Sequence, residues 1–298
     1  MRYTLRQLQV FLATARSGNL SKAADSLAMS QSAASSALRD LEELYQIKLF
    51  DRVGKRLKIN ALGASIQGKS EALIEQAQSL ETALEGNLGP GKLRVGATLT
   101  IGNYLAIEMI AAFQRRFPQA SVALSVANTE AIVGQLLSYS LDVGLIEGEL
   151  SHADLDIQPW RQDELVVFAH PEHPLVSLPS LSDDALLSAA WVVREPGSGT
   201  RQTFDRAMAG LLPSLDISLE LQHTEAIKRA VAAGLGLGCL SGICLQDAFQ
   251  QGSLVPLAVP QRDFKRHFSI VMHREKYRAS GLLAWLTLCK ESQHPLMD

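Results

Sequence analysis

From the segment LRVGAT onward, short apolar runs alternate with helical patterns, and this alternation constrains the fold more than any other feature of the sequence. LRVGAT, SVALSVAN and DVGLIEG are typical of strands, with helices expected at 101–117 and 130–139. A second series runs from WVVR, through helices that start at Thr200 and Glu225, to LGLGCLS. Such β–α–β series predict parallel sheets with ligands at the carboxyl ends of the strands. The sequence therefore predicts an α/β body over 90–298, with two lobes and a cleft between them.

The chain is expected to cross between the lobes twice. We place the crossings near 161–165 and 265–268, with RHFSIVMHR returning to the first lobe. The expected limits are about 92–162 and 268–298 for lobe I, and about 163–267 for lobe II.

The first sixty residues carry helical patterns of a different kind. Apolar residues recur at helical spacing over residues 5–15, and Gly18 with the following asparagine ends that helix. Ser21 is predicted to cap a short helix over 22–27, and Ser30 to cap a third, longer helix. Two helices joined by a short turn, the second longer, are typical of a helix-turn-helix.

The third predicted helix starts as SQSAASSALR, whose small polar side chains can enter a DNA major groove. A basic hairpin is predicted next, with 49–50 pairing with 57–59 around Gly54. A hairpin beside a helix-turn-helix is a wing, and its cations suit backbone phosphates. A small helical bundle with solvated charges is the alternative. The candidate DNA-binding residues are Ser21, Ser30, Gln31, Ser32, Ser35, Ser36, Arg39, Arg52, Lys55 and Arg56.

Charge is distributed unevenly along the chain. Residues 1–60 hold ten lysines and arginines against five acidic residues, whereas the remainder holds 18 against 26. A basic head on an acidic body indicates a module that binds a polyanion, such as double-stranded DNA, joined to a domain with another task. No run approaches the roughly 18 apolar residues that a membrane helix needs, and the start lacks the pattern of a secretory signal. Together with only three cysteines, these features predict a cytoplasmic protein without membrane association.

The stretch LRQLQVFLATARSGNLSKAADSLAMSQSAASSALRDLEELYQIKLFDR closely resembles the N-terminal region of LysR-type transcriptional regulators. The matching positions are Phe11, Ala23, Ala24, Leu27, Ser30, Gln31, Ser32, Ser35, Leu38, Leu41, Glu42, Leu49, Phe50 and Arg52. The resemblance implies a winged helix-turn-helix at 1–60, a dimerising linker helix at 61–89, and a two-lobed effector domain similar to periplasmic binding proteins. It further implies a homodimer or homotetramer that acts on DNA.

A long helix is predicted after the wing. Asn60 is expected to cap it, and the breakers at 89–91 close it near Asn87. A sparse seam recurs at heptad spacing, formed by Ile66, Leu73 and Leu80 and, four positions on, by Ser70, Ala77 and Leu84. The seam favours dimerisation, which lets two recognition helices meet successive major grooves. Packing of a lone amphipathic helix against its own body is the alternative.

Helix starts rich in hydroxyl groups follow the strands of both lobes. REPGSGTR follows WVVR and opens a helix, so backbone N–H groups from Ser198 onward lack helical partners at a positive dipole end. The loop is neither a Walker A loop nor a nucleophile elbow. Thr98 with Thr100, Thr129, and Thr224 precede other helices in the same way. Each alone is an ordinary N-cap, but four around one cleft favour a small anionic ligand.

Further segments resemble the LysR-type regulators that serve sulphur assimilation, which include a sulphite-responsive regulator: ATLTIGNYL, SVANTEAIV, VGLIEGE, DELVVFAHPEHPL, REPGSGTR and EAIKRAVAAGLGLGCLS. Carbon-fixation regulators share the REPGSGTR loop. This resemblance implies that the effector is held by Thr98, Thr100, Thr129, Ser198 and Thr200, with Glu147 nearby. The helix starts add Gly199 and Thr224 to the candidates.

The carboxylate of Glu147 is an unexpected neighbour for an anion. It repels an anionic effector unless one of the two carries a proton, as hydrogen sulphite does, or a water bridges them. Most members of the family bind organic acids, and His223 suits an effector of that different kind. The sequence therefore predicts a small anionic effector without identifying it.

Two further hypotheses arise from the body. Cys239 and Cys244 could form a redox switch, but no basic residue adjoins them in sequence to favour a thiolate, so we expect buried packing. An enzyme that acts on a small acid in the cleft is the alternative from another class. The seven histidines show no close pair at ligand spacing, and no nucleophile–base pair is evident. We therefore predict no catalytic residue, metal or cofactor.

Overall fold

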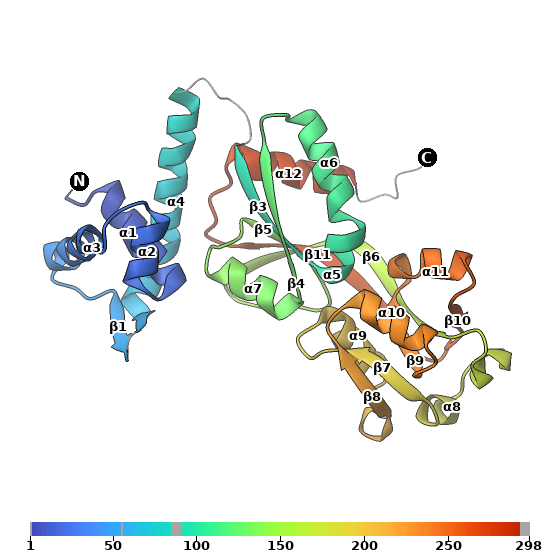
Figure 1. The fold of residues 1–298 in the computed structure, drawn as a ribbon. Coiled ribbons are helices and arrows are strands. Elements are labelled where there is room, and N and C mark those ends of the chain that lie inside the picture. Colours follow the sequence, from blue (N-terminus) through green and yellow to red (C-terminus); the bar gives the residue numbers. More distant parts are fainter. Residues whose placement is uncertain (1, 55, 85–90, 293–298) are drawn as a thin grey trace.

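The structure is a computed structural model that describes residues 2–54, 56–84 and 91–292. Figure 1 shows a small head on one side, a long helix beside it, and an elongated α/β body. The head consists of α1 (Leu5–Ser17), α2 (Leu20–Ser26), α3 (Gln31–Tyr45), β1 (Phe50–Val53) and β2 (Arg56–Ile59). The two strands pair antiparallel, with Phe50 opposite Ile59. The predicted winged helix-turn-helix is confirmed.

Side-chain caps set the starts of α1 and α3. Thr4 forms a capping box with Gln7 at the start of α1. The Ser30 hydroxyl accepts a hydrogen bond from the Ala33 N–H (3.2 Å), so the predicted cap of α3 is confirmed. Between these helices lies a core of apolar side chains that includes Leu8, Phe11, Ala24, Ala34, Leu38 and Leu49.

The predicted cap of α2 at Ser21 is wrong. The Asn19 side chain accepts hydrogen bonds from the N–H groups of Ser21 (2.9 Å) and Lys22 (3.1 Å), so α2 begins at Leu20. Gly18 ends α1 in a left-handed conformation (φ 60°), and Asn19 follows in extended backbone. Asparagine caps a helix as well as serine does, and the turn places Asn19 first.

Helix α4 (Ala61–Leu84) joins the head to the body. The Asn60 Oδ1 accepts a hydrogen bond from the Gly63 N–H (2.9 Å), which confirms the predicted cap. Ile74 of α4 is buried in the head core, so the helix packs against α1 for part of its length. The predicted extension to Asn87 and the breakers Gly89 and Pro90 lie outside the described residues.

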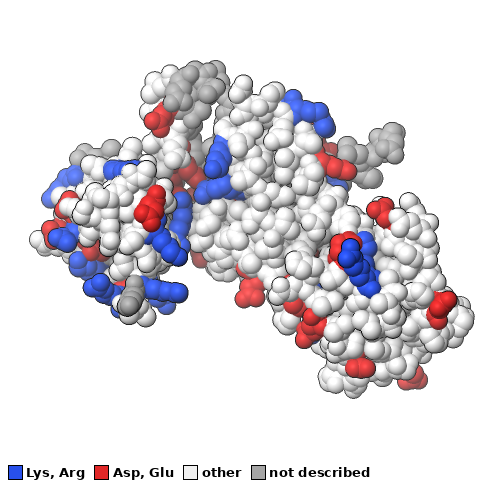
Figure 2. Space-filling view, viewed as in Figure 1, with Lys and Arg blue, Asp and Glu red and all other residues white. Residues whose placement is uncertain are grey.

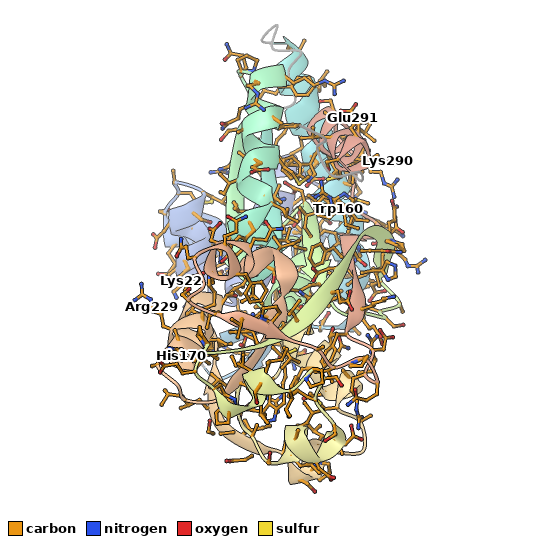
Figure 3. The ribbon with its side chains drawn as sticks, turned by 90° about the vertical axis from the view of Figure 1, so that its right-hand side faces the viewer. Lys22, Trp160, His170, Arg229, Lys290 and Glu291 are labelled. Atoms are coloured by element: carbon orange, nitrogen blue, oxygen red, sulfur yellow. The ribbon has the colours of Figure 1, made fainter. Side chains whose placement is uncertain are left out.

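Lobe I is built on a sheet whose strands run in the order β4-β3-β5-β11-β6. Strands β3, β4 and β5 are parallel, as predicted, and β11 returns antiparallel to β5. Apart from the long strands β6 and β11, lobe I consists of β3 (Lys92–Thr98), α5 (Leu99–Tyr104), α6 (Ala106–Arg116), β4 (Ser121–Ala127), α7 (Thr129–Leu137), β5 (Val143–Glu147) and α12 (Ser280–Glu291). Trp160 of β6 donates its indole N–H to the Cys289 carbonyl of α12 (2.7 Å; Figure 3), which ties the last helix to this sheet.

Lobe II continues the same sheet in the order β6-β9-β7-β8, with β10 on the other edge of β6. Its elements are η1 (Pro174–Ser177), α8 (Asp183–Leu187), β7 (Ala190–Arg194), α9 (Gly199–Ala207), η2 (Leu212–Ser214), β8 (Asp216–Leu221), α10 (Thr224–Ala232), β9 (Leu237–Ser241), η3 (Gly242–Cys244), α11 (Gln246–Gln250) and β10 (Val255–Leu257). Strands β7, β8 and β9 are parallel, so the second predicted series is also confirmed.

Two long strands connect the lobes. Strands β6 (Leu155–Ala169) and β11 (Lys265–His273) pair with each other and run from one lobe into the other (Figure 1). Their register shifts between Phe268 and Ser269. Strand β6 contains the segment 161–165 and β11 contains 265–268, the two segments at which crossings were expected.

The helix predicted over 101–117 is divided in two. Leu105 has φ −123°, outside the helical range, and separates α5 from α6. A Cβ added at Gly102 would lie 2.8 Å from the Val126 side chain, so α5 sits tightly over the end of β4. Helix α6 instead buries Met109 and Phe113 in the lobe I core. One straight helix cannot do both. In the described residues, no helix has the length and apolar character needed to cross a membrane.

Candidate functional site

The candidate DNA-reading side chains lie at the start of α3. Gln31, Ser32 and Ser36 are exposed, and Ser35 is half-buried. Spacings of three and four residues place Ser32, Ser36 and Arg39 on one helix face. This narrow polar face has the shape that a major groove accepts.

Basic residues of the head are available for a polyanion. Arg39, Arg52 and Arg56 are exposed and make no side-chain hydrogen bond or ion pair within the described part of the chain. Figure 2 shows Lys and Arg gathered along the lower and right-hand edges of the head, beside the wing. Ser21 is exposed at the start of α2, and Lys55 lies outside the described residues. Unpaired guanidinium groups are suited to phosphate contacts.

A row of leucines on α4 is uncovered. Leu73, Leu80 and Leu84 are 38%, 62% and 80% exposed, whereas Ser70 of the same predicted seam is buried. The helix packs on its own head through another face that includes Ile74. The alternative of packing on its own body therefore holds for one face of the helix, and dimerisation through the exposed leucines stays a prediction.

The cleft candidates converge where β3, β5 and β7 end. The Thr129 hydroxyl donates to the Glu147 carbonyl (3.1 Å), and a Cβ added at Gly199 would lie 1.9 Å from that same oxygen. Thr200 joins the same group through a hydrogen bond from Arg266. Thr100 contacts Cys244.

Three of the predicted helix caps are wrong, although the residues lie at the helix starts. Thr100 is inside α5, and Thr129 and Thr224 are the first residues of α7 and α10. The cap of α7 is Asn128, whose side chain accepts from the Ala131 N–H (3.0 Å). Asparagine again takes the cap from a neighbouring hydroxyl residue, which leaves the threonine hydroxyl free for another contact.

Ser198 caps α9 as predicted, because its side chain accepts from the Arg201 N–H (3.4 Å). Thr98 is at the capping position of α5 but makes no side-chain capping bond. His223 precedes α10 in the same manner without a side-chain bond. The first N–H groups of these helices therefore remain without a side-chain acceptor.

Three buried polar groups near the ends of these strands have no partner. They are the hydroxyls of Thr98 and Thr224, which are 1% and 2% exposed, and Nη1 of Arg194. The rest of the Arg194 guanidinium is held by Glu195, with Nε–Oε2 at 2.8 Å and Nη2–Oε1 at 2.9 Å. A buried donor without an acceptor costs about 1–3 kcal/mol. These groups are available to a partner that the polypeptide does not itself supply.

Arg266 of β11 is the central basic residue of the cleft, and the sequence analysis missed it. Its Nη2 lies 2.6 Å from Glu147 Oε2, its Nε 2.6 Å from Asp163 Oδ2, and its Nη1 3.0 Å from the Thr200 hydroxyl. Both charged pairs are almost fully buried. One guanidinium thus joins lobe I, the crossing strand β6 and lobe II. A charged residue within the apolar crossing run RHFSIVMHR was the signal available in the sequence.

Asp163 belongs to the same cluster. The Ser241 hydroxyl donates to its Oδ1 (2.6 Å), and burial raises the pKa of Asp163 although Arg266 and Ser241 act in the opposite direction. The cluster therefore contains one cation and two carboxylates, one of which resists ionisation. Arg266 pairs with Glu147 as well as with Asp163, so Glu147 is not an unpaired carboxylate in the cleft.

Contacts between the lobes extend beyond Arg266. The Tyr104 hydroxyl of α5 donates to Glu225 Oε1 of α10 (2.7 Å), and Asn128 Nδ2 donates to Glu195 Oε1 (3.3 Å). The Glu130 N–H donates to the Gly197 carbonyl (3.3 Å). The loop after β7 therefore touches the start of α7, and the cleft residues face one another across a short distance.

The cysteines are buried and free. The structure brings Arg266 near Cys244, which corrects the expectation that nothing basic adjoins it. Burial nevertheless raises the pKa of the Cys244 thiol to about 12, and burial also raises the pKa of Cys239. A thiol that stays protonated is a poor nucleophile, which agrees with packing rather than redox exchange. Within the described residues, no three His, Cys, Asp or Glu side chains are placed to hold a metal ion.

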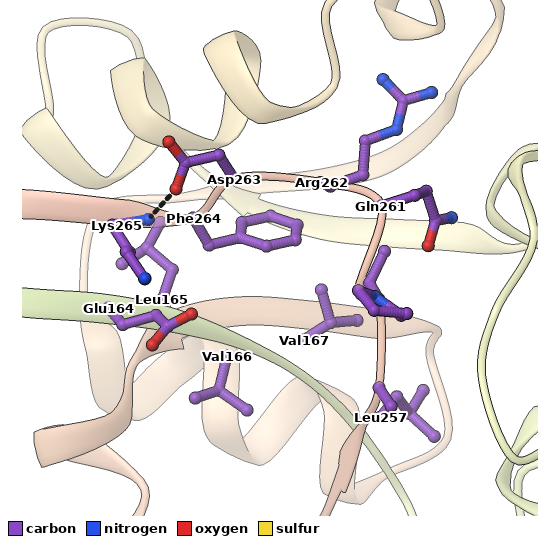
Figure 4. A pocket seen from close by; sticks show the side chains of 13 residues that line it. Glu164, Leu165, Val166, Val167, Leu257, Gln261, Arg262, Asp263, Phe264 and Lys265 are labelled. Carbon is purple, nitrogen blue, oxygen red and sulfur yellow. Dashed lines mark hydrogen bonds between the residues drawn. The ribbon is translucent and has the colours of Figure 1, made fainter.

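One pocket lies outside the cleft. It has a volume of about 520 Å³ and lies in lobe II between β6 and the segment 257–265 (Figure 4). Val166, Val167 and Leu257 line one side, and Phe264 lies opposite. A smaller pocket of about 350 Å³ is lined by 162–164 and 265–267, on the crossing strands themselves.

Two family models match the chain. Residues 86–293 match the LysR substrate binding domain, and residues 5–64 match the bacterial regulatory helix-turn-helix proteins of the lysR family. The HTH-type transcriptional regulator YeiE of Escherichia coli is 40% identical over 296 residues, which cover 99% of this chain and 100% of that protein. The helix-turn-helix model and this relative both describe transcriptional regulators.

Solved structures share the fold. Full-length OxyR of Pseudomonas aeruginosa superposes with a TM-score of 0.75 at 20% identity, with both chains covered completely. The regulatory domain of CcmR from Synechocystis PCC6803, solved in complex with 2-PG, gives a TM-score of 0.64 at 27% identity and covers 69% of this chain and 99% of that chain.

Proposed function

The chain belongs to the LysR family of DNA-binding transcriptional regulators, and we propose that its interlobe cleft binds a small inorganic oxyanion, with sulphite as the first candidate, and thereby controls sulphur-linked genes. The observation that carries the proposal is the set of unpartnered buried donors at Thr98, Thr224 and Arg194. A small acceptor bound between the lobes would satisfy them.

The starts of α9 and α10 add to these donors. Backbone N–H groups at a helix N-terminus, together with the helix dipole, favour an anion. Ser198, Gly199 and Thr200 form the first turn of α9, and Gly199 has no side chain to block access to its N–H. The effector contacts that we propose are Thr98, Thr100, Thr129, Ser198, Gly199, Thr200 and Thr224, with Glu147 positioned through Arg266.

The ion pair between Glu147 and Arg266 makes Glu147 compatible with an anionic effector. The Glu147 carboxylate lies 2.6 Å from the guanidinium, which Asp163 shares, so it is not an unpaired carboxylate in the cleft. Because Arg266 also holds Thr200 of lobe II, a ligand that draws on either residue alters the contact between the lobes. Its differential affinity for the open and closed arrangements would shift that equilibrium.

We propose that the head acts as one half of a homodimer, and that dimers can pair further into tetramers. The leucine row of α4 supplies the apolar surface for a second copy. Two recognition helices would then meet successive major grooves, with Gln31, Ser32, Ser35, Ser36 and Arg39 at base edges and Arg52 and Arg56 at phosphates.

Thermal unfolding of the full chain tests the effector class. The additives are sulphite, sulphate, thiosulphate, phosphate, chloride and several small carboxylates. A ligand present at a hundred times its Kd stabilises the effector domain by about 2.7 kcal/mol. We expect a shift with one inorganic oxyanion, and no such shift in Thr98→Val, in which the unpartnered hydroxyl is replaced by a methyl group.

The other outcomes distinguish the alternatives. A shift produced only by carboxylates would keep the regulator but assign it an organic acid. No shift with any additive would contradict a small anionic effector. Conversion of a carboxylate or an oxyanion by the purified chain would instead indicate an enzyme.

A further inference from the structure

A group of charged side chains joins the linker helix α4 to lobe I. Glu75 of α4 forms an ion pair with Lys276, and its Oε1 lies 3.6 Å from Arg94 Nη2. On the lobe I side, Asp142 Oδ1 lies 2.6 Å from Arg94 Nη2 and 2.8 Å from Lys276 Nζ. Lobe I thus presents two cations and one carboxylate, and the carboxylate of α4 balances the remaining positive charge. We call Arg94, Asp142 and Lys276 the socket.

The socket is largely shielded from water. The side chain of Lys276 is 3% exposed, and those of Asp142 and Glu75 are 10% and 16% exposed. Removal of one partner from a buried pair leaves an uncompensated charge, which is much more costly than the pair itself was favourable. The socket therefore discriminates strongly between the position in which Glu75 is seated and any other position of α4.

Close packing at Gly68 gives a second point of contact. A Cβ added there would lie 2.0 Å from Glu275 Oε2 and 2.3 Å from the Tyr139 hydroxyl, which is held by His273 Nδ1 at 2.9 Å. Gly68 and Glu75 are seven residues apart and so lie on one face of the helix. This face of α4 is docked on lobe I by charge at one point and by shape at another.

Helix α4 also contacts the head. Glu71, one turn before Glu75, forms an ion pair with Arg16 of α1, and Ile74 is buried in the head core. Two carboxylates four residues apart on α4 therefore pair with cations of different domains. Glu71 binds the head and Glu75 binds lobe I.

The socket residues lie in or next to the strands that form the effector cleft. Arg94 is in β3, which ends at Thr98, and Asp142 directly precedes β5, which ends at Glu147. Lys276 follows β11, whose second residue is Arg266. The same three strands thus carry cleft residues at one end and the socket at the other.

We propose that Glu75 is a positioning residue that fixes the orientation of the DNA-binding head relative to the effector domain, and so sets the half-site spacing that this regulator accepts. The proposal goes beyond effector binding, and it holds whichever effector occupies the cleft.

A pair of cysteines reports the docking directly. A Cβ at Gly68 lies 3.1 Å from the Glu275 Cβ, somewhat less than the roughly 3.8 Å of a disulfide. Glu275→Cys and Tyr139→Phe remove the carboxylate and the hydroxyl that would obstruct a side chain at position 68. The full chain with these two changes and Gly68→Cys is expected to form an intrachain disulfide under mild oxidation, seen as a monomer of altered mobility on a non-reducing gel. Adding Glu75→Gln should slow its formation by about tenfold or more. Adding Glu81→Gln, at an exposed acid further along α4, should leave the rate unchanged.

Equal rates in the two backgrounds would overturn the proposal. A disulfide that forms only between chains would also overturn it, because α4 would then dock on another copy.

Hydrogen exchange tests the docking without new cysteines. Glu75→Gln removes the charge, and Gly68→Ala obstructs the contact by shape. Both should speed amide exchange in segments 66–78 and 274–278 by about tenfold. Gly134→Ala is the matched control, because nothing lies within 4 Å of a Cβ at that helical glycine. Exchange that accelerates equally in the control would overturn the proposal.

Selection of DNA from a random library gives the functional outcome. The wild-type chain and Glu75→Asp, which keeps the charge, are expected to select paired half-sites at one spacing. Glu75→Gln is expected to select several spacings, with each half-site sequence unchanged. A single, unaltered spacing in Glu75→Gln would refute the positioning role.

Discussion

The start of α3 and the interlobe cleft are built from the same kind of side chain but bury it differently. Ser32 and Ser36 of α3 are exposed, whereas Thr98 and Thr224 of the cleft are buried and have no partner. An exposed hydroxyl exchanges water for a DNA base at little cost. A buried hydroxyl has already lost its water, so it gains most from a ligand that fits. The same chemistry therefore serves a large external partner in one region and a small enclosed partner in the other.

Cations of the head and of the body also differ in their environment, both in exposure and in pairing. Arg39, Arg52 and Arg56 of the head form no ion pair with the described residues. In the body, Arg266 and Lys276 are almost fully buried, and each contacts two carboxylates. Free cations attract a polyanion, whereas paired ones hold domains in place. The predictions below test this contrast.

Arg266→Met should have the largest effect. It leaves Glu147 and Asp163 buried without a cation, which should destabilise the effector domain by about 4 kcal/mol. Thermal unfolding of the full chain measures this loss. Arg39→Met, at an exposed position of α3, should change the free energy of unfolding by less than about 0.5 kcal/mol. Equal losses in both variants would remove the contrast between paired and free cations.

Asp142 should make the free energy of unfolding fall steeply as the pH is lowered. Burial alone would raise the pKa of Asp142, but Arg94 and Lys276 more than compensate and lower it. Its contribution is therefore complete above the unfolded pKa of about 3.9 and is lost as the pH falls through the lower folded pKa. Asp142→Asn should lower the free energy of unfolding by about 3 kcal/mol near neutral pH and weaken its decrease at acid pH. Urea unfolding between pH 7 and pH 3 measures both, with Asp25→Asn in the head as the control.

Gln31 and Arg52 should separate base reading from phosphate binding. Gln31→Ala should relax the preference for the operator by about 2 kcal/mol, because a base contact is lost. Arg52→Ala should weaken binding to all sequences and reduce the salt slope by about 1. Affinity for operator and random DNA at several salt concentrations distinguishes the two. A uniform loss across sequences for Gln31→Ala would show that it does not read bases.

Thr98→Val should give the smallest effect, with an unusual sign. Replacing a buried hydroxyl that has no partner should stabilise the chain without effector by about 1 kcal/mol. Ser32→Ala in the exposed face of α3 should change stability by less than about 0.5 kcal/mol. Chemical denaturation compares the two variants. A loss of stability in Thr98→Val would mean that the hydroxyl is already satisfied in the free protein.

Local signals made the head and the order of elements predictable. Ser30 and Asn60 cap their helices, and apolar spacing sets α1, because these effects act within one or two turns. The alternation of strand and helix in the body is equally local. Where two capping residues compete, as at Asn19 and Ser21, the sequence allows both and the turn geometry selects one.

The sequence by itself determined the winged head, the linker helix, the two β–α–β series and the strand ends at which the cleft residues gather. Only the tertiary structure decided which charges meet. Arg266 pairs with Glu147 across 119 residues, and Glu75 pairs with Lys276 across 201. Buried pairs of this kind depend on strand order and on how domains dock, and neither leaves a pattern in the neighbouring residues. The physical reason is range, because caps and periodicity act along the chain, whereas burial and ion pairing act through space.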